Sequence, residues 1–195
     1  MGPLIRIVLA GGLVAAAPAS GGPVDRWQGL IEQASIRFGI PARWIEQVMA
    51  AESRGLPQLD GYPIRSRAGA MGLMQLMPAT WATMRARLKL GDNPDDPRDN
   101  ILAGSLYLRL MYDRFGYPSL FAAYNAGPGR FARATAASAP LPAETRTYLA
   151  TVTKGIETPE RPAGNPLFAV RNEPGENGDG APTGSSIFAV RKVLP

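Results

Sequence analysis

Apolar side chains recur at helical spacing along most of the chain. In the segment Pro41–Ser53 the apolar residues Trp44, Ile45, Val48 and Met49 define one helical face. The same period, bounded by Pro and Gly, predicts helices at residues 23–39, 41–53, 78–90, 100–115, 118–124, 130–137 and 142–156. We therefore expect one all-α domain over residues 23–157.

Glu52 interrupts the apolar face of the 41–53 helix. It follows Val48 by four residues and Met49 by three, so its side chain projects from the same face. An ionised carboxylate is costly there, and more so near the negative end of a helix. Both effects raise its pKa, which suits a general acid. The alternative is a helix-end Glu that turns outward into solvent.

The first 19 residues have the pattern of a secretory signal peptide. Arg6 precedes an apolar run at residues 7–16, and Ala17–Ala19 supplies a small-x-small cleavage site. The run is shorter than the roughly 20 residues that span a bilayer, so an uncleaved anchor is the weaker alternative. We expect export to the periplasm without a stable membrane anchor.

Residues 158–195 lose the helical period and are rich in Pro and Gly, which predicts a flexible tail. Within them Leu167–Arg171 is repeated as Ile187–Arg191, with Phe-Ala-Val-Arg common to both. Each copy could add a strand to a sheet of a partner protein. Folding back on the domain and a neutral duplication remain the alternatives.

The composition excludes several kinds of chemistry. The chain contains no Cys and no His, so a Ser-His-Asp triad, a thiol nucleophile and the common zinc motifs are absent. We expect neither a metal nor another cofactor. The net charge of +5 fits an acidic polymer such as an anionic cell wall. The basic residues are scattered and form no nucleic-acid-binding motif, so we expect no nucleic-acid partner.

Two further stretches combine small residues with isolated polar side chains. Gln75 lies within the run Gly72–Pro78, where a buried amide needs a substrate or backbone partner. Tyr124 and Asn125 come where a predicted helix stops at Gly127, so both side chains can point into a cleft. The alternative for Asn125 is a simple helix cap.

These motifs together resemble the catalytic domain of the soluble lytic transglycosylases, from about Ile31 to Val152. The matching pieces are Glu52-Ser53, Gly69-Ala70, Gly72–Pro78 with Thr80, Ala123–Gly127 and Tyr148. The resemblance implies a lysozyme-like all-α fold with a substrate cleft. It implies that Glu52 is the sole catalytic carboxylate and that substrate is bound by Ser66, Gly72, Gln75, Met77, Tyr124, Asn125 and Tyr148. It also implies a hydrogen bond between Tyr124 and Glu52.

The resemblance implies cleavage of peptidoglycan between N-acetylmuramic acid and N-acetylglucosamine, with a 1,6-anhydro product. Short exported members resemble enzymes of secretion and conjugation systems, and we expect a monomer that reaches such machinery through its tail. The segment between Glu52 and Gly72 is a few residues longer than is usual in the family. Its Asp60 leaves open a hydrolytic muramidase that uses Glu52 and Asp60. A non-catalytic glycan-binding module is the other alternative.

Overall fold

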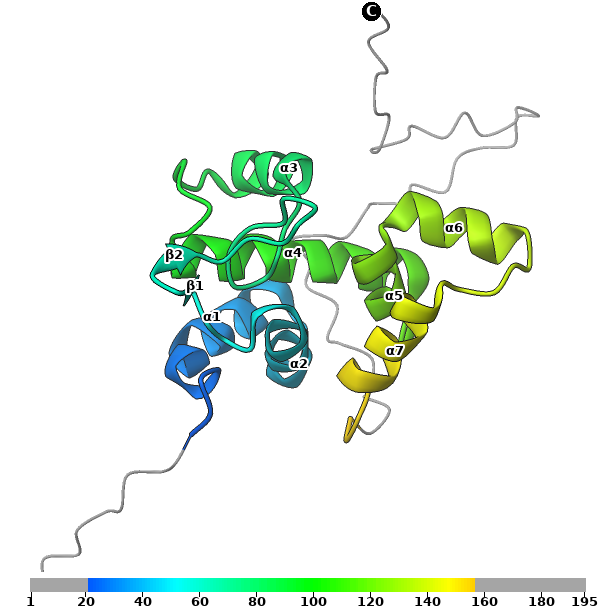
Figure 1. Cartoon of the computed structure of the whole chain (residues 1–195), viewed down its shortest axis with the longest axis horizontal. Helices are drawn as coiled ribbons and strands as arrows, with labels where there is room; N and C mark the ends of the chain where they lie inside the picture. The colour runs from blue at the N-terminus through cyan, green and yellow to red at the C-terminus, as the bar shows by residue number, and fades with distance from the viewer. Residues whose placement is uncertain (1–20, 157–195) are drawn as a thin grey trace, which may run out of the picture. The chain divides into compact units, whose positions relative to one another are not determined.

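The long helix α4 (Pro97–Phe115) runs through the middle of the domain. In the computed structural model, which describes residues 21–156, α1 (Gln28–Phe38) and α3 (Pro78–Leu88) pack against it, and α5 (Ser119–Ala126) packs on its C-terminal half (Figure 1). The expected signal peptide and tail lie outside the described residues. The expected all-α class is confirmed for residues 21–156.

Helix α4 begins three residues before the expected start at Asn100. Asp96 is its N-cap and accepts a hydrogen bond from the Asp99 amide, at 2.9 Å. Pro97 occupies the first helical position, where its missing N–H removes no intrahelical hydrogen bond. Asp99 lies in the first turn of the helix.

Helices α1 and α2 (Ala42–Ser53) form a hairpin on one side of the domain. A short 3₁₀ turn, η1 (Asp25–Trp27), precedes α1, and Gly39 ends α1 in the left-handed conformation, with φ of 60°. The predicted apolar face of α2 is fully buried at Trp44, Ile45, Val48 and Met49. This burial fixes which way the end of α2 points.

Residues 55–67, which lie between two of the predicted helices, contain a small β-hairpin. Strands β1 (Gln58–Leu59) and β2 (Tyr62–Pro63) pair antiparallel, with Leu59 opposite Tyr62. Asp60 and Gly61 form the turn with φ of 51° and 82°, which is the signature of a type I′ turn. The dipeptide Asp-Gly was the sequence signal for this turn.

The C-terminal half of the domain consists of α5, α6 (Pro128–Ala136) and α7 (Ala143–Val152). Helices α6 and α7 both pack on α5, and α7 also packs on α2 (Figure 1). Trp44 of α2 stacks on Tyr117 and meets Phe121 of α5 edge-on, at ring distances of 5.7 Å in both cases. These contacts join the two halves and bring α7 next to the end of α2.

Hydropathy adds one finding for localisation. Within residues 21–156, no helix has both the length and the apolar character needed to cross a membrane.

Gly104 of α4 allows a close approach between two elements of the core. A Cβ at this position would lie 2.5 Å from the Cβ of the fully buried Met74. We expect Gly104→Ala to lower the free energy of unfolding by about 1–3 kcal/mol through overpacking, although Ala favours a helix by about 1 kcal/mol. Urea unfolding measures this change.

The matched control is Gly29→Ala in α1, where an added Cβ would meet nothing within 4 Å. There the helix preference acts alone, so this variant should gain up to about 1 kcal/mol. Equal behaviour of the two variants would contradict the tight contact between Gly104 and Met74.

Candidate active site

Glu52 lies in the last turn of α2 and faces a cleft of about 510 Å³. One wall of the cleft comes from α2, the 66–77 segment and Thr80 of α3. The other wall comes from the end of α5, the start of α6 and Glu144 of α7. The full lining consists of Glu52, Ser66, Ala68, Ala70, Gln75, Leu76, Met77, Thr80, Tyr107, Tyr124, Asn125, Ala126, Gly127, Pro128, Arg130 and Glu144.

The chain that follows Glu52 is held in place on both sides. The Ser53 hydroxyl donates to the Met49 carbonyl and accepts from the Gly55 amide, each at 3.2 Å. The indole N–H of Trp27 donates to the Gly55 carbonyl at 2.9 Å. Gly55 has a φ of 73°, and its backbone lies directly against the residues before η1. The end of α2, and with it Glu52, is therefore fixed to the N-terminal turn.

Burial raises the pKa of Glu52 from 4.5 to about 7. The nearby carboxylate of Glu144 raises this pKa further, because two like charges repel, while the Tyr148 hydroxyl acts in the opposite direction. A carboxylic acid with this pKa is largely protonated at mildly acidic pH and can still ionise at neutral pH. Such a group can both give and take a proton.

Tyr148 reaches Glu52 from α7 but does not line the main cleft. Its hydroxyl is buried and meets no partner within strict hydrogen-bond geometry, yet it approaches Glu52 closely enough to lower the pKa of the carboxyl. Burial raises the pKa of Tyr148 itself well above its usual range, so this hydroxyl stays protonated. It is therefore a proton donor that favours the ionised form of Glu52.

Tyr124 lines the cleft, but its hydrogen bond differs from the expected one. Its hydroxyl donates to the Met74 carbonyl at 2.8 Å rather than to Glu52. Its ring meets that of Tyr107 at a centroid distance of 5.1 Å, and burial raises the pKa of both phenols. With its single proton directed to Met74, Tyr124 has only acceptor capacity left for the cleft.

The 66–77 segment is folded tightly on itself beside Glu52. The Ser66 hydroxyl accepts from the Ala70 amide at 2.9 Å, and the Ser66 amide donates to the Ala70 carbonyl at 3.1 Å. Met71 pairs with Leu76 through two backbone hydrogen bonds. Ser66 therefore lines the cleft and also closes the loop that forms this wall.

Gly72 does not line the cleft, which corrects the expected role of this residue. It is buried behind the wall with a φ of 71°, and an added Cβ would lie 2.4 Å from the side-chain nitrogen of Asn100. Its carbonyl accepts a hydrogen bond from the side-chain amide nitrogen of Gln75 at 2.8 Å. Gly72 is thus needed for close packing of the loop on α4 and for orienting Gln75.

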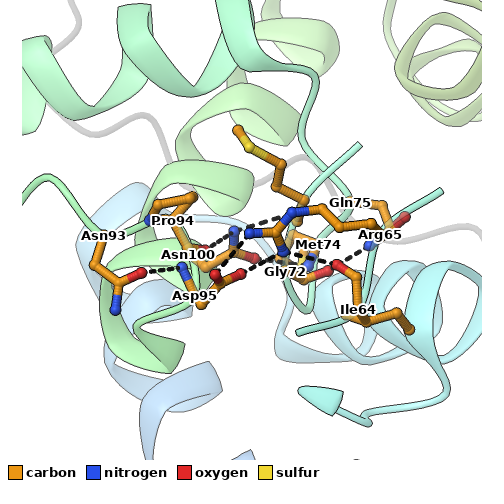
Figure 2. A network of polar contacts seen from close by, with 10 residues as sticks. Ile64, Arg65, Gly72, Met74, Gln75, Asn93, Pro94, Asp95 and Asn100 are labelled. Atoms are coloured by element: carbon orange, nitrogen blue, oxygen red, sulfur yellow. Dashed lines mark hydrogen bonds and ion pairs between the residues drawn. The ribbon is translucent and has the colours of Figure 1, made fainter. Parts of the chain in front are cut away.

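The buried side chain of Asn100 ties the loop to the start of α4 (Figure 2). Its oxygen accepts from the Met74 amide at 2.8 Å, and its nitrogen donates to the carbonyls of Met71 and Pro94. Every polar atom of this side chain thus has a partner. The sequence had given Asn100 no role beyond its place at the helix start.

A partly exposed ion pair connects two segments of the same network. The guanidinium of Arg65 binds both carboxylate oxygens of Asp95, at 2.5 and 2.6 Å, and also donates to the Ile64 carbonyl (Figure 2). The Asp95 carboxylate accounts for the raised pKa of Arg65. This pair joins the segment before Ser66 to the loop before α4.

Gln75 and Met77 both line the cleft, as the sequence predicts for binding residues. Gln75 has a φ of 45°, an unfavourable conformation for a residue with a Cβ, and the surrounding hydrogen bonds hold it there. Its side chain makes one hydrogen bond within the described residues, so its oxygen and second N–H can serve a ligand. Met77 is 45% exposed and gives this wall an apolar edge.

Asn125 lines the opposite wall and is fixed by α7. Its side-chain oxygen accepts from the Thr145 hydroxyl at 2.9 Å. This bond couples the end of α5 to the first turns of α7, where Glu144 also lines the cleft. Asn125 is therefore more than a helix cap.

Three polar or charged lining residues were not expected from the sequence: Tyr107, Arg130 and Glu144. Tyr107 occupies a core position of α4, Arg130 follows a Pro-Gly pair, and Glu144 is an acid in a first helical turn. In the sequence alone, each of these three residues has an ordinary structural explanation. Only the packing of α4, α6 and α7 reveals that they meet one cleft.

Asp60 does not line the cleft. It occupies the exposed turn between β1 and β2, so the second acid near Glu52 is Glu144. Among residues 21–156, no group of three or more His, Cys, Asp and Glu side chains is placed to hold a metal ion.

The raised pKa of Glu52 links stability to pH. Between about 4.5 and 7 the folded protein holds a proton that the unfolded chain has released, so the free energy of unfolding should fall as pH rises. At about 1.4 kcal/mol per pKa unit, the total is at most about 3.5 kcal/mol. Glu52→Gln removes this dependence and should be the more stable protein above pH 7.

The measurement is urea unfolding of both proteins at a series of pH values from 4 to 8. Because all other titrating groups are shared, their contributions cancel in the difference between the two proteins. A difference that stays constant with pH would contradict the buried, protonated Glu52.

Comparisons with known proteins identify the family. The transglycosylase SLT domain matches residues 29–145. The transglycosylase of Enterobacteria phage PRD1 is 33% identical over 132 residues, which cover 67% of this chain and 43% of that protein. The soluble lytic murein transglycosylase of Escherichia coli K12 is 38% identical over 98 residues, which cover 47% of this chain and 14% of that protein.

Solved structures agree with this match. An inactive mutant of the lytic transglycosylase Slt from Pseudomonas aeruginosa superposes with a TM-score of 0.56 at 28% identity, covering 64% of this chain and 22% of that one. The 70-kDa soluble lytic transglycosylase of Escherichia coli gives a TM-score of 0.55 at 30% identity, covering 65% and 22%. The chain thus spans less than half the length of these relatives. The match over residues 29–145, on a helical domain built around Glu52, shows that this chain belongs to the transglycosylase SLT domain family, with the lysozyme-like fold of the lytic transglycosylases.

Proposed function

We propose that the protein is a peptidoglycan lytic transglycosylase that cleaves the β-1,4 bond between N-acetylmuramic acid and N-acetylglucosamine. The observation that carries this proposal is the Glu52 carboxyl, whose pKa is raised to about 7 by burial at the edge of a cleft of about 510 Å³. Membership of the transglycosylase SLT domain family supports the same reaction.

In the proposed reaction Glu52 acts first as an acid and then as a base. Its proton passes to the glycosidic oxygen as the bond from that oxygen to C1 of the muramic acid breaks. The substrate's own acetamido group helps to stabilise the positive charge at C1. The 6-hydroxyl of the same sugar then bonds to C1 and gives its proton to ionised Glu52, which leaves a 1,6-anhydro end and restores the acid.

The two tyrosines near Glu52 suit opposite stages of this cycle. Tyr148 is a donor and favours the ionised carboxylate. The Tyr124 hydroxyl already donates its hydrogen bond to the Met74 carbonyl. It can therefore only accept a hydrogen bond from Glu52, which suits the protonated carboxyl. Burial raises the pKa of Glu52 to about 7, and a pKa near neutrality lets one residue serve both steps.

The remaining lining residues have proposed roles in binding the glycan. Gln75 and Asn125 offer amide groups from opposite walls, and Ser66 offers a hydroxyl near the acetamido group. Met77 supplies an apolar edge against a sugar face. Gly72 contributes indirectly, through the shape of the loop.

A hydrolytic muramidase is the nearest alternative. It requires a second carboxylate that activates water or attacks the sugar. Asp60 is unsuited to this role because it lies on the exposed hairpin turn. Glu144 lines the cleft, so hydrolysis, if it occurs, would depend on Glu144.

The setting of the reaction is also part of the proposal. Residues 1–19 direct export, which places the enzyme in the periplasm, where its substrate lies. An exported enzyme of this kind would open local gaps in the wall for a secretion or conjugation system. The two tail segments, Leu167–Arg171 and Ile187–Arg191, would recruit that machinery, and the catalytic domain would act as a monomer.

Product analysis tests the reaction. Purified peptidoglycan is digested with the wild-type protein, with Glu52→Gln and with the control Asp60→Asn, and soluble products are identified by mass spectrometry. We expect 1,6-anhydro products from wild type and Asp60→Asn, and a loss of at least 100-fold in rate for Glu52→Gln because no other acid replaces it.

Each other outcome has a definite meaning. Reducing-end products from wild type would overturn the transglycosylase in favour of hydrolysis and call for Glu144→Gln. Binding of glycan without any products would favour the non-catalytic module.

The pH dependence of kcat/KM tests the tuning of Glu52. Activity should fall above about pH 7, because the general acid is then ionised. Glu144→Gln removes a repelling charge, lowers the pKa of Glu52 and should shift this fall to lower pH. Tyr148→Phe removes a donor to the carboxylate, raises that pKa and should shift the fall to higher pH. Initial rates on soluble glycan strands between pH 4 and 9 measure both shifts, and shifts in the same direction would contradict the assignment.

A further inference from the structure

The cleft contains an arginine that the proposed reaction does not use. Of the lining residues only Glu52, Glu144 and Arg130 are charged, so Arg130 is the one cation lining the cleft within the described residues. It forms no hydrogen bond or ion pair with any residue between 21 and 156. Although Glu144 lines the same cleft, the two side chains do not pair.

The surroundings of Arg130 add to its positive potential. It lies in the first turn of α6, two residues after Pro128, and both Gly127 and Pro128 also line the cleft. Gly127 is the N-cap and provides no side-chain hydrogen bond to the helix. The first turn of a helix carries free N–H groups and a partial positive charge, which favour an anion nearby.

Arg65 shows by contrast what a structural arginine looks like in this domain. It precedes the lining residue Ser66, but both of its terminal nitrogens are held by Asp95. Arg109, inside the core, is likewise bound to Asp113 and to the Phe38 carbonyl. Arg130 has the accessibility and the unsatisfied donors that a ligand-binding arginine needs.

The proposed substrate supplies one obvious anion. Of its two sugars, N-acetylglucosamine is uncharged, whereas N-acetylmuramic acid carries a lactyl group. The lactyl carboxylate is either free or linked to a stem peptide that has carboxylates of its own. A planar guanidinium binds a carboxylate through two parallel hydrogen bonds, with more specificity than a simple charge.

We propose that Arg130, at the start of α6, binds a carboxylate of the glycan substrate, on the lactyl group or on the stem peptide, and thereby selects muramic-acid-bearing strands. This inference rests on the proposed function and adds a determinant of substrate choice to it. Arg130 would be a binding residue rather than part of the proton transfer.

The test compares three substrates made from the same strands. The first keeps its stem peptides. The second has lost them to an amidase and bears free lactyl carboxylates. In the third, carbodiimide and methylamine have converted the carboxylates into uncharged methylamides. Each is cut by wild type, Arg130→Gln, Arg130→Lys and the control Arg133→Gln. Arg133 is exposed on the same helix but does not line the cleft. Thermal melting of each variant checks its fold.

We expect Arg130→Gln to lower kcat/KM about tenfold on strands that bear the recognised carboxylate and to have no effect on the methylamide strands. Arg130→Lys should fall in between, because it keeps the charge without the fork. Arg133→Gln should match wild type throughout. The tenfold difference should shrink as salt is raised, since the interaction is partly exposed to solvent.

The pattern of losses identifies the source of the carboxylate. A loss on the amidase-treated strands assigns the lactyl carboxylate, and a loss confined to peptide-bearing strands assigns the stem. Equal losses on charged and methylamide strands, or no loss on any strand, would overturn the role of Arg130.

Binding separates this inference from the proposed function. Calorimetric titration of the three substrates into Glu52→Gln, with and without Arg130→Gln, measures the carboxylate contact without turnover. Absence of 1,6-anhydro products from wild type would refute the reaction alone, whereas unchanged affinity for charged strands after Arg130→Gln would refute the contact alone.

Discussion

The burial of one carboxyl group, that of Glu52, is the constraint on which the rest of the site depends. The chain has no His or Cys, and Glu52 is the cleft-lining residue whose pKa lies near neutrality. Burial supplies most of this shift and Glu144 adds to it, while Tyr148 limits it. The negative end of α2 acts in the same direction as burial. The apolar face that anchors α2 in the core is thus also the reason that Glu52 can serve as an acid.

Helix α4 determines the shape of the cleft because both walls are built on it. The buried Asn100 side chain binds the backbone of the loop that carries Gln75, and Gly104 lets Met74 approach closely. Helix α5, packed on the other end of α4, carries Tyr124 and Asn125. Tyr124 returns a hydrogen bond to Met74, which joins the two walls at their base. A polar core residue with every atom paired fixes one arrangement of the loop.

The cleft combines neutral polar side chains with a few charged ones, and this combination suits a substrate with uncharged sugars and charged substituents. Ser66 and Gln75 offer neutral hydrogen-bonding groups next to Glu52, where a nearby cation would favour the ionised carboxylate and weaken the acid. Arg130 and Glu144 lie on the opposite wall. On our proposal, the sugar rings are held by neutral contacts, and an acidic substituent is bound by Arg130.

The sequence by itself determined the helices, the apolar face of α2 and the position of Glu52 on that face, because these follow from local spacing. It also contained the Asp60-Gly61 turn and the Pro97 helix start, although only the structure made these signals evident. Which residues face Glu52 across the cleft was decided by tertiary packing. Tyr107, Arg130 and Glu144 come from three helices whose own patterns are ordinary, and the roles of Gly72 and Tyr124 depend on contacts with α4 and Met74. Local periodicity specifies which side of a helix is buried, but the groups that meet in a cleft are set by how separate helices pack together.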